Sequence, residues 1–175
     1  GDLAELKHVL ATEPGRVNEA NEVGWSALMR AAVKGDLPMV AELLSTKGIA
    51  VDLGDKEGNT AIHYAATNGH EVILRVLADR GADVNKQDIE GFTALCWASA
   101  KGHESTARCL LSLGALPETP GAPADGQPEA EARRAGHAKL ADYLRAVIDA
   151  GGYAAHEISR GQKPVAKVSL PELVK

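Results

Sequence analysis

The feature that most constrains this chain is a nine-residue pattern that occurs three times at a nearly constant spacing. The copies begin at Gly24, Gly58 and Gly91, which are 34 and then 33 residues apart. A second glycine follows each of these after eleven residues. A period near 33 residues is the signature of a stacked helical repeat, in which each unit buries its apolar face against its neighbours. The chain is therefore expected to be built from stacked helical repeats.

Each copy belongs to a longer pattern, which is most complete over residues 55–85. It runs Asp-x-x-Gly-x-Thr-Ala-Ile-His-Tyr-Ala-Ala, continues as an apolar helical stretch, and closes with Gly-Ala-Asp-Val-Asn at residues 81–85. This pattern resembles the ankyrin repeat, with Ala61 where that family usually has proline. The resemblance implies an all-α ankyrin-repeat solenoid of helix-turn-helix repeats joined by β-hairpin-like loops.

The repeat spacing divides the chain into units. We expect an ankyrin-repeat domain over residues 1–150, followed by a C-terminal tail or linker over residues 151–175. A half repeat at the start is indicated by the apolar stripe Leu6, Val9 and Leu10, which recurs in the next unit. The expected units are a half repeat (1–20), three full repeats (21–54, 55–87 and 88–120) and a degenerate capping repeat (121–150).

Small polar residues and glycines mark the expected helix ends. Ser26, Thr60 and Thr93 each precede an apolar helical run, where a side-chain oxygen can accept a hydrogen bond from an unpaired backbone N–H. Gly35 follows the first of these runs, as glycine often does because it reaches φ > 0 without a Cβ penalty. We therefore expect the first helix of each full repeat to begin directly after its Ser or Thr.

Three histidines, His70, His103 and His137, recur directly after the glycine between the two helices of a repeat. Residues one repeat apart should lie about 10 Å from each other, which is close to the distance between packed helices. Zinc needs its ligands about 2 Å from a shared centre. We therefore expect these histidines to make hydrogen bonds at helix starts, and we predict no metal site.

The pattern changes after the third full repeat. Proline and glycine interrupt it between residues 117 and 126, and we expect this long loop to be mobile or to fold over a partner. A polar helix around residues 128–135 then begins the capping repeat. Further on, residues 165–168 alternate like an extended segment, and Ser169 is expected to cap a short helix. The tail is a linker, a segment packed on the last repeat, or a docking peptide.

Composition limits the class of partner. The formal net charge is −5 and the pI is near 5.7, whereas nucleic-acid binders usually present a basic face. No stretch approaches the roughly 18 apolar residues of a membrane span. The two cysteines are too few for a disulfide framework. We therefore expect a cytoplasmic or nuclear protein. We also expect it to be a monomer that binds neither nucleic acids nor membranes.

No catalytic motif is present. The chain lacks a nucleophile elbow, a phosphate-binding glycine loop, a His-Glu-x-x-His pair and paired Cys-x-x-Cys motifs. Cys96 is formally a nucleophile that a histidine could serve, but it stands where the ankyrin family usually has histidine and where the side chain packs between repeats. The chain is therefore expected to be no enzyme and to use no cofactor.

The aromatic residues indicate where a partner binds. The chain has two Trp, three Tyr and one Phe, and four of these fall in two columns of the repeat. The resemblance implies that these columns face the concave surface on which ankyrin repeats bind partners. Trp, Tyr and Arg are enriched at binding hot spots. The expected partner-binding residues are Trp25, Arg30, Lys34, Asn59, Tyr64, Asn68, Phe92, Trp97 and Lys101.

The resulting hypothesis is a non-catalytic scaffold or adaptor that binds a protein or peptide on its concave face. The alternative is a targeting or regulatory segment of a larger enzyme, such as a ubiquitin-ligase subunit or a kinase. Asn85 also resembles the ankyrin asparagines that undergo β-hydroxylation, although such an asparagine more often satisfies loop backbone groups. Both interpretations of Asn85 stay open at this point.

Overall fold

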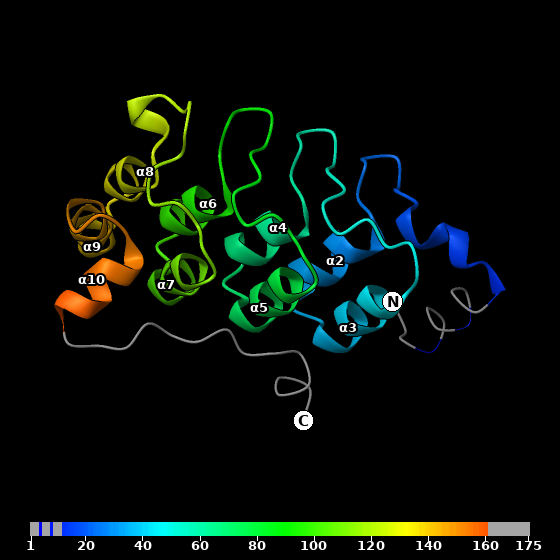
Figure 1. The fold of residues 1–175 in the computed structure, drawn as a ribbon. Helices are drawn as coiled ribbons and strands as arrows, with labels where there is room; N and C mark the ends of the chain where they lie inside the picture. The colour runs from blue at the N-terminus through cyan, green and yellow to red at the C-terminus, as the bar shows by residue number, and fades with distance from the viewer. Residues whose placement is uncertain (1–3, 5–7, 9–11, 161–175) are drawn as a thin grey trace.

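The computed structural model describes residues 4, 8 and 12–160. Within them are nine α-helices, of which the first eight form stacked pairs and the ninth packs at the C-terminal end of the stack (Figure 1). This confirms the all-α repeat solenoid expected from the sequence. The half-repeat stripe of Leu6, Val9 and Leu10 lies outside the described residues. In chain order the elements are the 3-10 helix η1 (Pro14–Asn18), α2 (Ala27–Lys34), α3 (Leu37–Ser45), α4 (Ala61–Thr67), α5 (Glu71–Asp79), α6 (Ala94–Ala100), α7 (Glu104–Ser112), the 3-10 helix η2 (Ala124–Gly126), α8 (Pro128–Arg134), α9 (Ala138–Asp149) and α10 (Tyr153–Ser159).

The helices form two rows, and loops project from one of them (Figure 1). The first helices of the pairs, α2, α4, α6 and α8, contact one another in sequence, and α3, α5 and α7 do the same in the second row. No strand forms between residues 12 and 160, where an isolated bridge joins Ala20 and Ser26. The loops are nevertheless closed like hairpins, because Asp55 N–H donates to Asn59 O at 3.0 Å and Asp88 N–H donates to Phe92 O at 2.9 Å.

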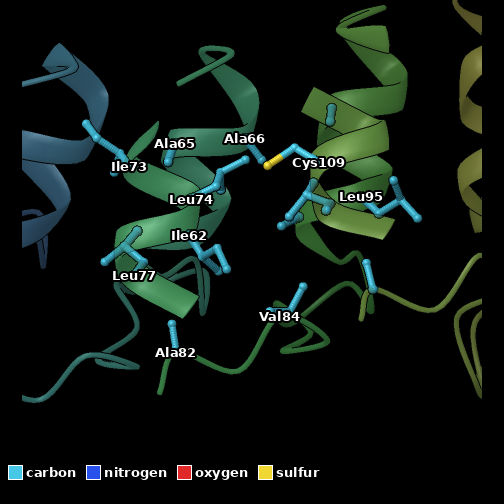
Figure 2. Packing of buried hydrophobic residues seen from close by; sticks show 14 of the residues in the cluster. Ile62, Ala65, Ala66, Ile73, Leu74, Leu77, Ala82, Val84, Leu95 and Cys109 are labelled. Carbon is cyan, nitrogen blue, oxygen red and sulfur yellow. The ribbon is translucent and has the colours of Figure 1, made fainter. Parts of the chain in front are cut away.

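Alanine and branched aliphatic side chains fill the space between the two rows (Figure 2). Ile62, Leu74 and Leu77 are almost fully buried in the middle repeat. Ala65 and Ala66, also buried, let neighbouring helices approach closely because their side chains are short. Interiors of this kind are close-packed, so the stack holds its loops in fixed relative positions.

A Ser or Thr precedes the first helix of each full repeat, as predicted, but the hydrogen bonds that it makes differ from one repeat to the next. Ser26 Oγ accepts from the N–H of Met29 at 3.3 Å, which confirms the first cap. Thr60 precedes α4, and its backbone N–H donates to the Nδ1 atom of His63 at 3.1 Å. Thr93 precedes α6, but its hydroxyl lies 3.4 Å from Cys96 Sγ and makes no cap bond to the backbone. The expected hydroxyl-to-backbone cap is therefore wrong for Thr93.

The period-matched histidines connect successive repeats. His70 Nε2 lies 3.1 Å from the carbonyl oxygen of Val33, and His103 Nε2 lies 3.0 Å from that of Thr67. A carbonyl only accepts, so Nε2 carries the hydrogen in both rings. Neither side chain caps its own helix, so the expected hydrogen bonds at helix starts are wrong. The rings instead join each second helix to the repeat before it.

Glycine is required beneath the first of these rings. Gly35 has a φ of 73°, and a Cβ there would lie 2.7 Å from Cε1 of His70. Gly69 stands at the equivalent position with a φ of 75°, but the nearest ring atoms of His103 would be 3.6 Å from its Cβ. The histidine therefore packs more closely on the glycine of the first full repeat than on that of the second.

A second set of contacts joins the loops of successive repeats. Asn85 Nδ2 donates to Gly114 O at 3.1 Å, and Asn85 Oδ1 accepts from Leu116 N–H at 2.8 Å. Asn18 makes the same pair of bonds to Gly48 O and Ala50 N–H, both at 2.8 Å. Asn85 therefore satisfies backbone groups of the next loop, which is one of the two interpretations that the sequence left open for it.

The long loop folds against its own chain. Gln127 Oε1 accepts from Thr119 N–H at 2.6 Å, and Gln127 Nε2 donates to the carbonyls of Thr119 and Ala122, each at 3.1 Å. Thr119 is buried, and its hydroxyl lies 3.6 Å from Cys96 Sγ. Gln127 therefore closes the loop on itself, and Thr119 contacts the first turn of α6; that the loop moves or folds over a partner stays a prediction.

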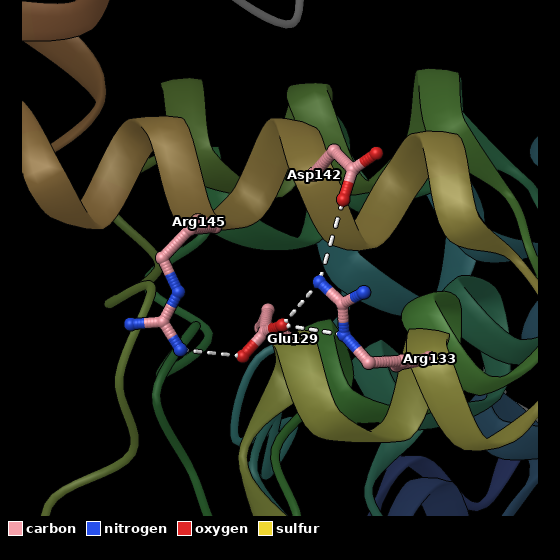
Figure 3. A network of polar contacts seen from close by, with 4 residues as sticks. All are labelled: Glu129, Arg133, Asp142 and Arg145. Carbon is pink, nitrogen blue, oxygen red and sulfur yellow. Dashed lines mark hydrogen bonds and ion pairs between the residues drawn. The ribbon is translucent and has the colours of Figure 1, made fainter.

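The last helix pair carries an ionic network (Figure 3). Helix α8 forms where a polar helix was expected, and its Glu129 is buried. Glu129 makes 2.8 Å ion pairs with Arg133 of α8 and Arg145 of α9, and Arg133 also lies 3.3 Å from Asp142. Burial raises the pKa of Glu129, but the hydrogen bonds and charges of both arginines outweigh it and lower the pKa overall. Polar groups of this kind suit the end of a solenoid.

Helix α10 was not predicted from the sequence. It packs on α9 and α7, with His156 against the Tyr143 ring at a centroid distance of 5.2 Å. The guanidinium of Arg108 lies 3.7 Å from the centroid of the same tyrosine ring. Burial raises the pKa of Tyr143 to about 12. The extended segment and the cap predicted for residues 165–168 and Ser169 lie outside the described residues.

Candidate partner-binding face

The nine expected partner-binding residues lie on the loops and on the first helices of three successive repeats. We call them the loop-and-helix face. One group follows the positive-φ glycine of each loop, and a second lies within the first helix. A third lies at or just past the end of that helix. The three groups are Trp25, Asn59 and Phe92; Arg30, Tyr64 and Trp97; and Lys34, Asn68 and Lys101.

The three groups differ in exposure. Trp25, Asn59 and Phe92 are half-buried, and so are Tyr64 and Trp97. The remaining four residues, which are polar or charged, are exposed: Arg30, Lys34, Asn68 and Lys101. The face therefore has a partly covered aromatic part and a fully accessible polar part.

The aromatic side chains form two pairs. The rings of Trp25 and Tyr64 have a centroid distance of 4.8 Å and an interplanar angle of 57°, so this pair joins two repeats. The rings of Phe92 and Trp97 are 6.0 Å apart at 61° and belong to one repeat. Such tilted arrangements contribute roughly 0.5–1.5 kcal/mol beyond the burial of area. Sequence spacing placed these residues in columns of the repeat. It did not show that one pair forms between two repeats and the other within a single repeat.

Two of the rings are each fixed by an aspartate of the preceding loop. The hydroxyl of Tyr64 donates to Oδ2 of Asp55, and Nε1–H of Trp97 donates to Oδ2 of Asp88 at 3.1 Å. Burial raises the pKa of Tyr64, and the hydrogen bond to Asp55 raises it further. The phenol therefore stays protonated and remains a donor at neutral pH.

The other carboxylate oxygen of each aspartate holds the loop. Oδ1 of Asp55 accepts from the N–H groups of Glu57 and Asn59, at 3.0 and 2.9 Å. Oδ1 of Asp88 accepts from the N–H groups of Glu90 and Phe92 at the same two distances. One carboxylate thus fixes both a loop backbone and an aromatic ring in each of these two repeats.

The first full repeat keeps the loop contact but not the ring contact. Asn21 replaces the aspartate, and its Oδ1 accepts from the N–H groups of Val23 and Trp25 at 3.2 and 2.9 Å. Arg30 replaces the aromatic residue, and its side chain has no hydrogen-bond or ion-pair partner within the described residues. At this position of the first helix, the face is therefore aromatic in two repeats and cationic in the first full repeat.

The loop tips carry exposed apolar residues that the sequence analysis did not single out. Ile89 is 73% exposed and Val23 is 57% exposed, which makes them the two most exposed large apolar side chains in the described part of the chain. Ile89 N–H donates to Glu57 O at 2.9 Å, so consecutive tips are connected. The available signal was an isoleucine directly between Asp88 and Glu90, in a loop that is otherwise polar.

The described side chains include no group of three or more His, Cys, Asp or Glu that could hold a metal ion. Cys96 is 1% exposed, and burial raises the pKa of Cys109 to about 11. A cysteine nucleophile reacts as its thiolate, which burial disfavours. Across residues 4, 8 and 12–160, the search for a helix long and apolar enough to cross a membrane finds none.

Two family models match the chain. The one described as "Ankyrin repeats (3 copies)" matches residues 1–88, and the one described as "Ankyrin repeats (many copies)" matches residues 70–111. The family is generally non-catalytic and generally mediates protein–protein interactions.

Individual relatives match shorter stretches. The human protein "NAD-capped RNA hydrolase NUDT12" is 37% identical over 73 residues, which are 42% of this chain and 16% of that protein. "Putative ankyrin repeat protein YahD" of Escherichia coli (strain K12) is 35% identical over 80 residues, which are 43% of this chain and 40% of that protein. "Ankyrin repeat-containing protein ITN1" of Arabidopsis thaliana is 44% identical over 63 residues, which are 34% and 10%.

The matched stretch thus covers less than half of each of these relatives. The first family model, by contrast, spans half of this chain, and the helix pairs stack as such repeats do. With its glycine-led motif, its paired helices and this match, the chain belongs to the ankyrin-repeat family.

Proposed function

We propose that this chain is a non-catalytic scaffold or adaptor that binds one protein or peptide partner across the loop-and-helix face. The observation that carries the proposal is the pairing of half-buried aromatic rings beside exposed polar side chains on consecutive repeats. Binding hot spots are enriched in Trp, Tyr and Arg and are surrounded by polar residues that exclude water. This face combines those components.

Fixed rings and loops favour binding. Tyr64 and Trp97 are held by Asp55 and Asp88, which also hold the backbones of their loops. A surface that is ordered before binding loses less conformational entropy when the partner arrives. Immobilising a rotamer-rich side chain costs roughly 0.5–1.5 kcal/mol, so two pre-ordered rings contribute to affinity without new contacts.

The remaining features belong to the same proposal. The chain acts as a monomer in the cytoplasm or nucleus, and its partners exclude nucleic acids and membranes. The net charge of −5 supports the exclusion of nucleic acids, because nucleic-acid binders usually present a basic face. The array spans residues 1–150 in the units given above, followed by the tail of residues 151–175. Modification of Asn85 stays a prediction, which mass spectrometry of native material would reject if no species heavier by one oxygen atom is found.

Affinity capture with matched variants tests the binding face. The full chain captures proteins from a cell extract, and so do Trp97→Ala and a control with a substitution on another surface, Lys139→Ala. Lys139 is exposed on α9, in the second row of helices. Proteins retained by wild type and control but lost by Trp97→Ala support the face. Circular dichroism establishes that each variant is folded.

Because Trp97 also contacts Asp88 and Phe92, a second variant separates binding from stability. Lys101→Ala changes an exposed side chain and should lower stability by at most the roughly 0.3–1 kcal/mol of its interaction with the helix dipole. If folded Trp97→Ala and Lys101→Ala both capture every protein that wild type captures, the face does not bind the partner.

The second candidate is a targeting or regulatory segment of a larger enzyme. The match to a hydrolase favours this candidate, because the shared stretch makes up only 16% of that protein. A ubiquitin-ligase subunit and a kinase are other enzymes that could carry such a segment. Sequencing the complete open reading frame decides this, because a catalytic domain in the same frame supports the second candidate.

A further inference from the structure

Three cations on the loop-and-helix face have no hydrogen-bond or ion-pair partner among the residues that the structure describes. Arg30 and Lys34 lie on α2, and Lys101 lies directly after α6; all three are exposed. Their side chains make no hydrogen bond or ion pair within the described residues. In contrast, Arg133 and Arg145 in the end network each contact a carboxylate. The face therefore carries three exposed positive charges that no described carboxylate neutralises, on a chain whose net charge is −5.

Helix electrostatics explain part of this pattern. Lys34 lies in the last turn of α2 and Lys101 at the C-cap of α6, where a cation gains about 0.3–1 kcal/mol from the helix dipole. At the equivalent place after α4, Asn68 donates from Nδ2 to Tyr64 O at 2.8 Å. Arg30 is different, because it lies in the middle of α2 and not at its end. A helix-end role therefore does not account for the whole set.

Negative charge lies elsewhere on the same side of the molecule. Glu22, Glu57 and Glu90 are exposed at the tips of the three loops. The loops project from the row of helices that includes α2 and α6 (Figure 1), and the three cations lie on α2 and directly after α6. The loop tips therefore carry both signs of charge, because the exposed Lys56 precedes Glu57, whereas the charged residues of α2 and of the end of α6 are all basic.

Resting on the function proposed above, we propose that the bound segment is an extended acidic peptide whose carboxylates lie along Arg30, Lys34 and Lys101. Opposite charges steer association and fix the register of a complex. Lys34 and Lys101 are two repeats apart, so they are separated by about 20 Å at the usual distance between packed helices. An extended chain rises about 3.3 Å per residue, so carboxylates about six residues apart match them.

The charge pattern also argues against the chain's own tail as the occupant. Residues 161–175 contain Lys163, Lys167 and Lys175 but a single acidic side chain, Glu172. A basic segment would be repelled by the cations of the helices. The occupant is therefore a separate acidic segment, with apolar side chains between its carboxylates to contact the aromatic pairs.

A peptide selection tests this. The full chain is immobilised and used to select binders from a display library of random peptides long enough to span three repeats. We expect the selected sequences to be enriched in Asp and Glu, with two acidic positions about six residues apart. Fluorescence anisotropy of a labelled selected peptide then gives its Kd for each variant.

The charge-reversed variant Lys34→Glu/Lys101→Glu should raise that Kd by about tenfold or more, and added salt should weaken binding to wild type. The control Lys47→Glu/Lys139→Glu makes the same change in net charge outside the face, at exposed residues beyond α3 and on α9. Its Kd should stay at the wild-type value. A purely structural role for Lys34 and Lys101 would instead lower the melting temperature without changing Kd, which overturns the proposal.

The other outcomes separate the two proposals. Neutral or basic binders that are lost on folded Trp97→Ala and weakened by Trp97→Phe uphold the interaction function and overturn the acidic partner. Acidic binders weakened equally by the control variant also overturn it, because their binding depends only on net charge. If no peptide depends on the face, both the acidic partner and the proposed function fail.

Discussion

The indole Nε1–H of Trp97 donates a 3.1 Å hydrogen bond to Oδ2 of Asp88, whose Oδ1 accepts from two backbone N–H groups of the loop. Trp97 lies on α6, and Asp88 begins the loop that precedes it. The contact therefore determines the position of an aromatic ring of the proposed binding face together with the shape of the loop beside it.

Two substitutions of Asp88 separate these contacts. Asp88→Ala removes the acceptors of all three hydrogen bonds and should lower the free energy of unfolding by about 2–3 kcal/mol, because partly buried donors lose their partners. Asp88→Asn keeps a carbonyl oxygen for the two backbone bonds and loses the indole bond, so it should cost about 1 kcal/mol. Urea unfolding measures both, and indole emission in a Trp25→Phe background reports on Trp97. Equal costs for the two variants would contradict this.

Asn85 should stabilise the stack through both atoms of its amide. Asn85→Ala removes the bonds to Gly114 O and Leu116 N–H and should cost about 1–3 kcal/mol. Asn85→Asp keeps an acceptor for Leu116 N–H, as Asp52 does for Asp83 N–H at 3.0 Å, and should cost less. The midpoint of urea unfolding gives the order. A larger loss for Asn85→Asp than for Asn85→Ala would refute the role of the amide.

Gly35 and Gly69, which hold equivalent positions in successive repeats, should differ in their tolerance of alanine. Both have positive φ, so either substitution costs roughly 1–2 kcal/mol from backbone strain. A Cβ at Gly35 would lie 2.7 Å from the His70 ring, whereas one at Gly69 would lie 3.6 Å from the His103 ring. Gly35→Ala should therefore lower the melting temperature more than Gly69→Ala. Indistinguishable melting temperatures would show that the ring moves away at no cost.

Glu129 should make stability depend on pH. Burial raises its pKa, but Arg133 and Arg145 outweigh burial and lower the pKa below its value in the unfolded chain. The other charged groups nearby are Asp142 on α9 and Arg134 on α8. A carboxyl group whose pKa is lower in the folded than in the unfolded chain stabilises the fold at pH values above its unfolded pKa, which is about 4.3 for Glu. This stabilisation is lost as the pH falls through the folded pKa.

Glu129→Gln is the matched variant, because it has nearly the same shape and cannot ionise. We expect wild type to be more stable than Glu129→Gln at pH 7, and the difference to shrink as the pH falls below the unfolded pKa of Glu, about 4.3. Urea unfolding at a series of pH values measures the difference. A gap that stays constant down to pH 3 would rule out this linkage.

Local sequence signals predicted the stacked helices well. Ser26 marked the start of α2, and Gly35 marked its end with a positive φ, because both roles depend on residues within one turn of the helix. The repeat period also placed Tyr64 and Trp97 at equivalent positions. These features could be predicted because each repeats three times within one chain.

Contacts between distant residues were not predictable in the same way. The loop held by Gln127 depends on an amide that reaches back eight residues to Thr119, and no periodic signal encodes this. Helix α10 is short and lacks an apolar stripe of the repeat type, and it is positioned by contact of His156 with Tyr143. The sequence likewise placed Trp25 and Tyr64 in different columns without indicating that their rings touch.

The contact between His70 and Gly35 gives the stack a direction. The glycine of one repeat lies beneath the histidine of the following repeat, and that histidine bonds to a carbonyl of the preceding one. A unit can therefore be added in only one orientation. Residues 55–87 carry both members, Gly69 and His70, together with the asparagine that bonds to the next loop. A second copy of that segment inserted after residue 87 could therefore meet a compatible neighbour on either side, and the array could be lengthened by whole units without redesigning its ends.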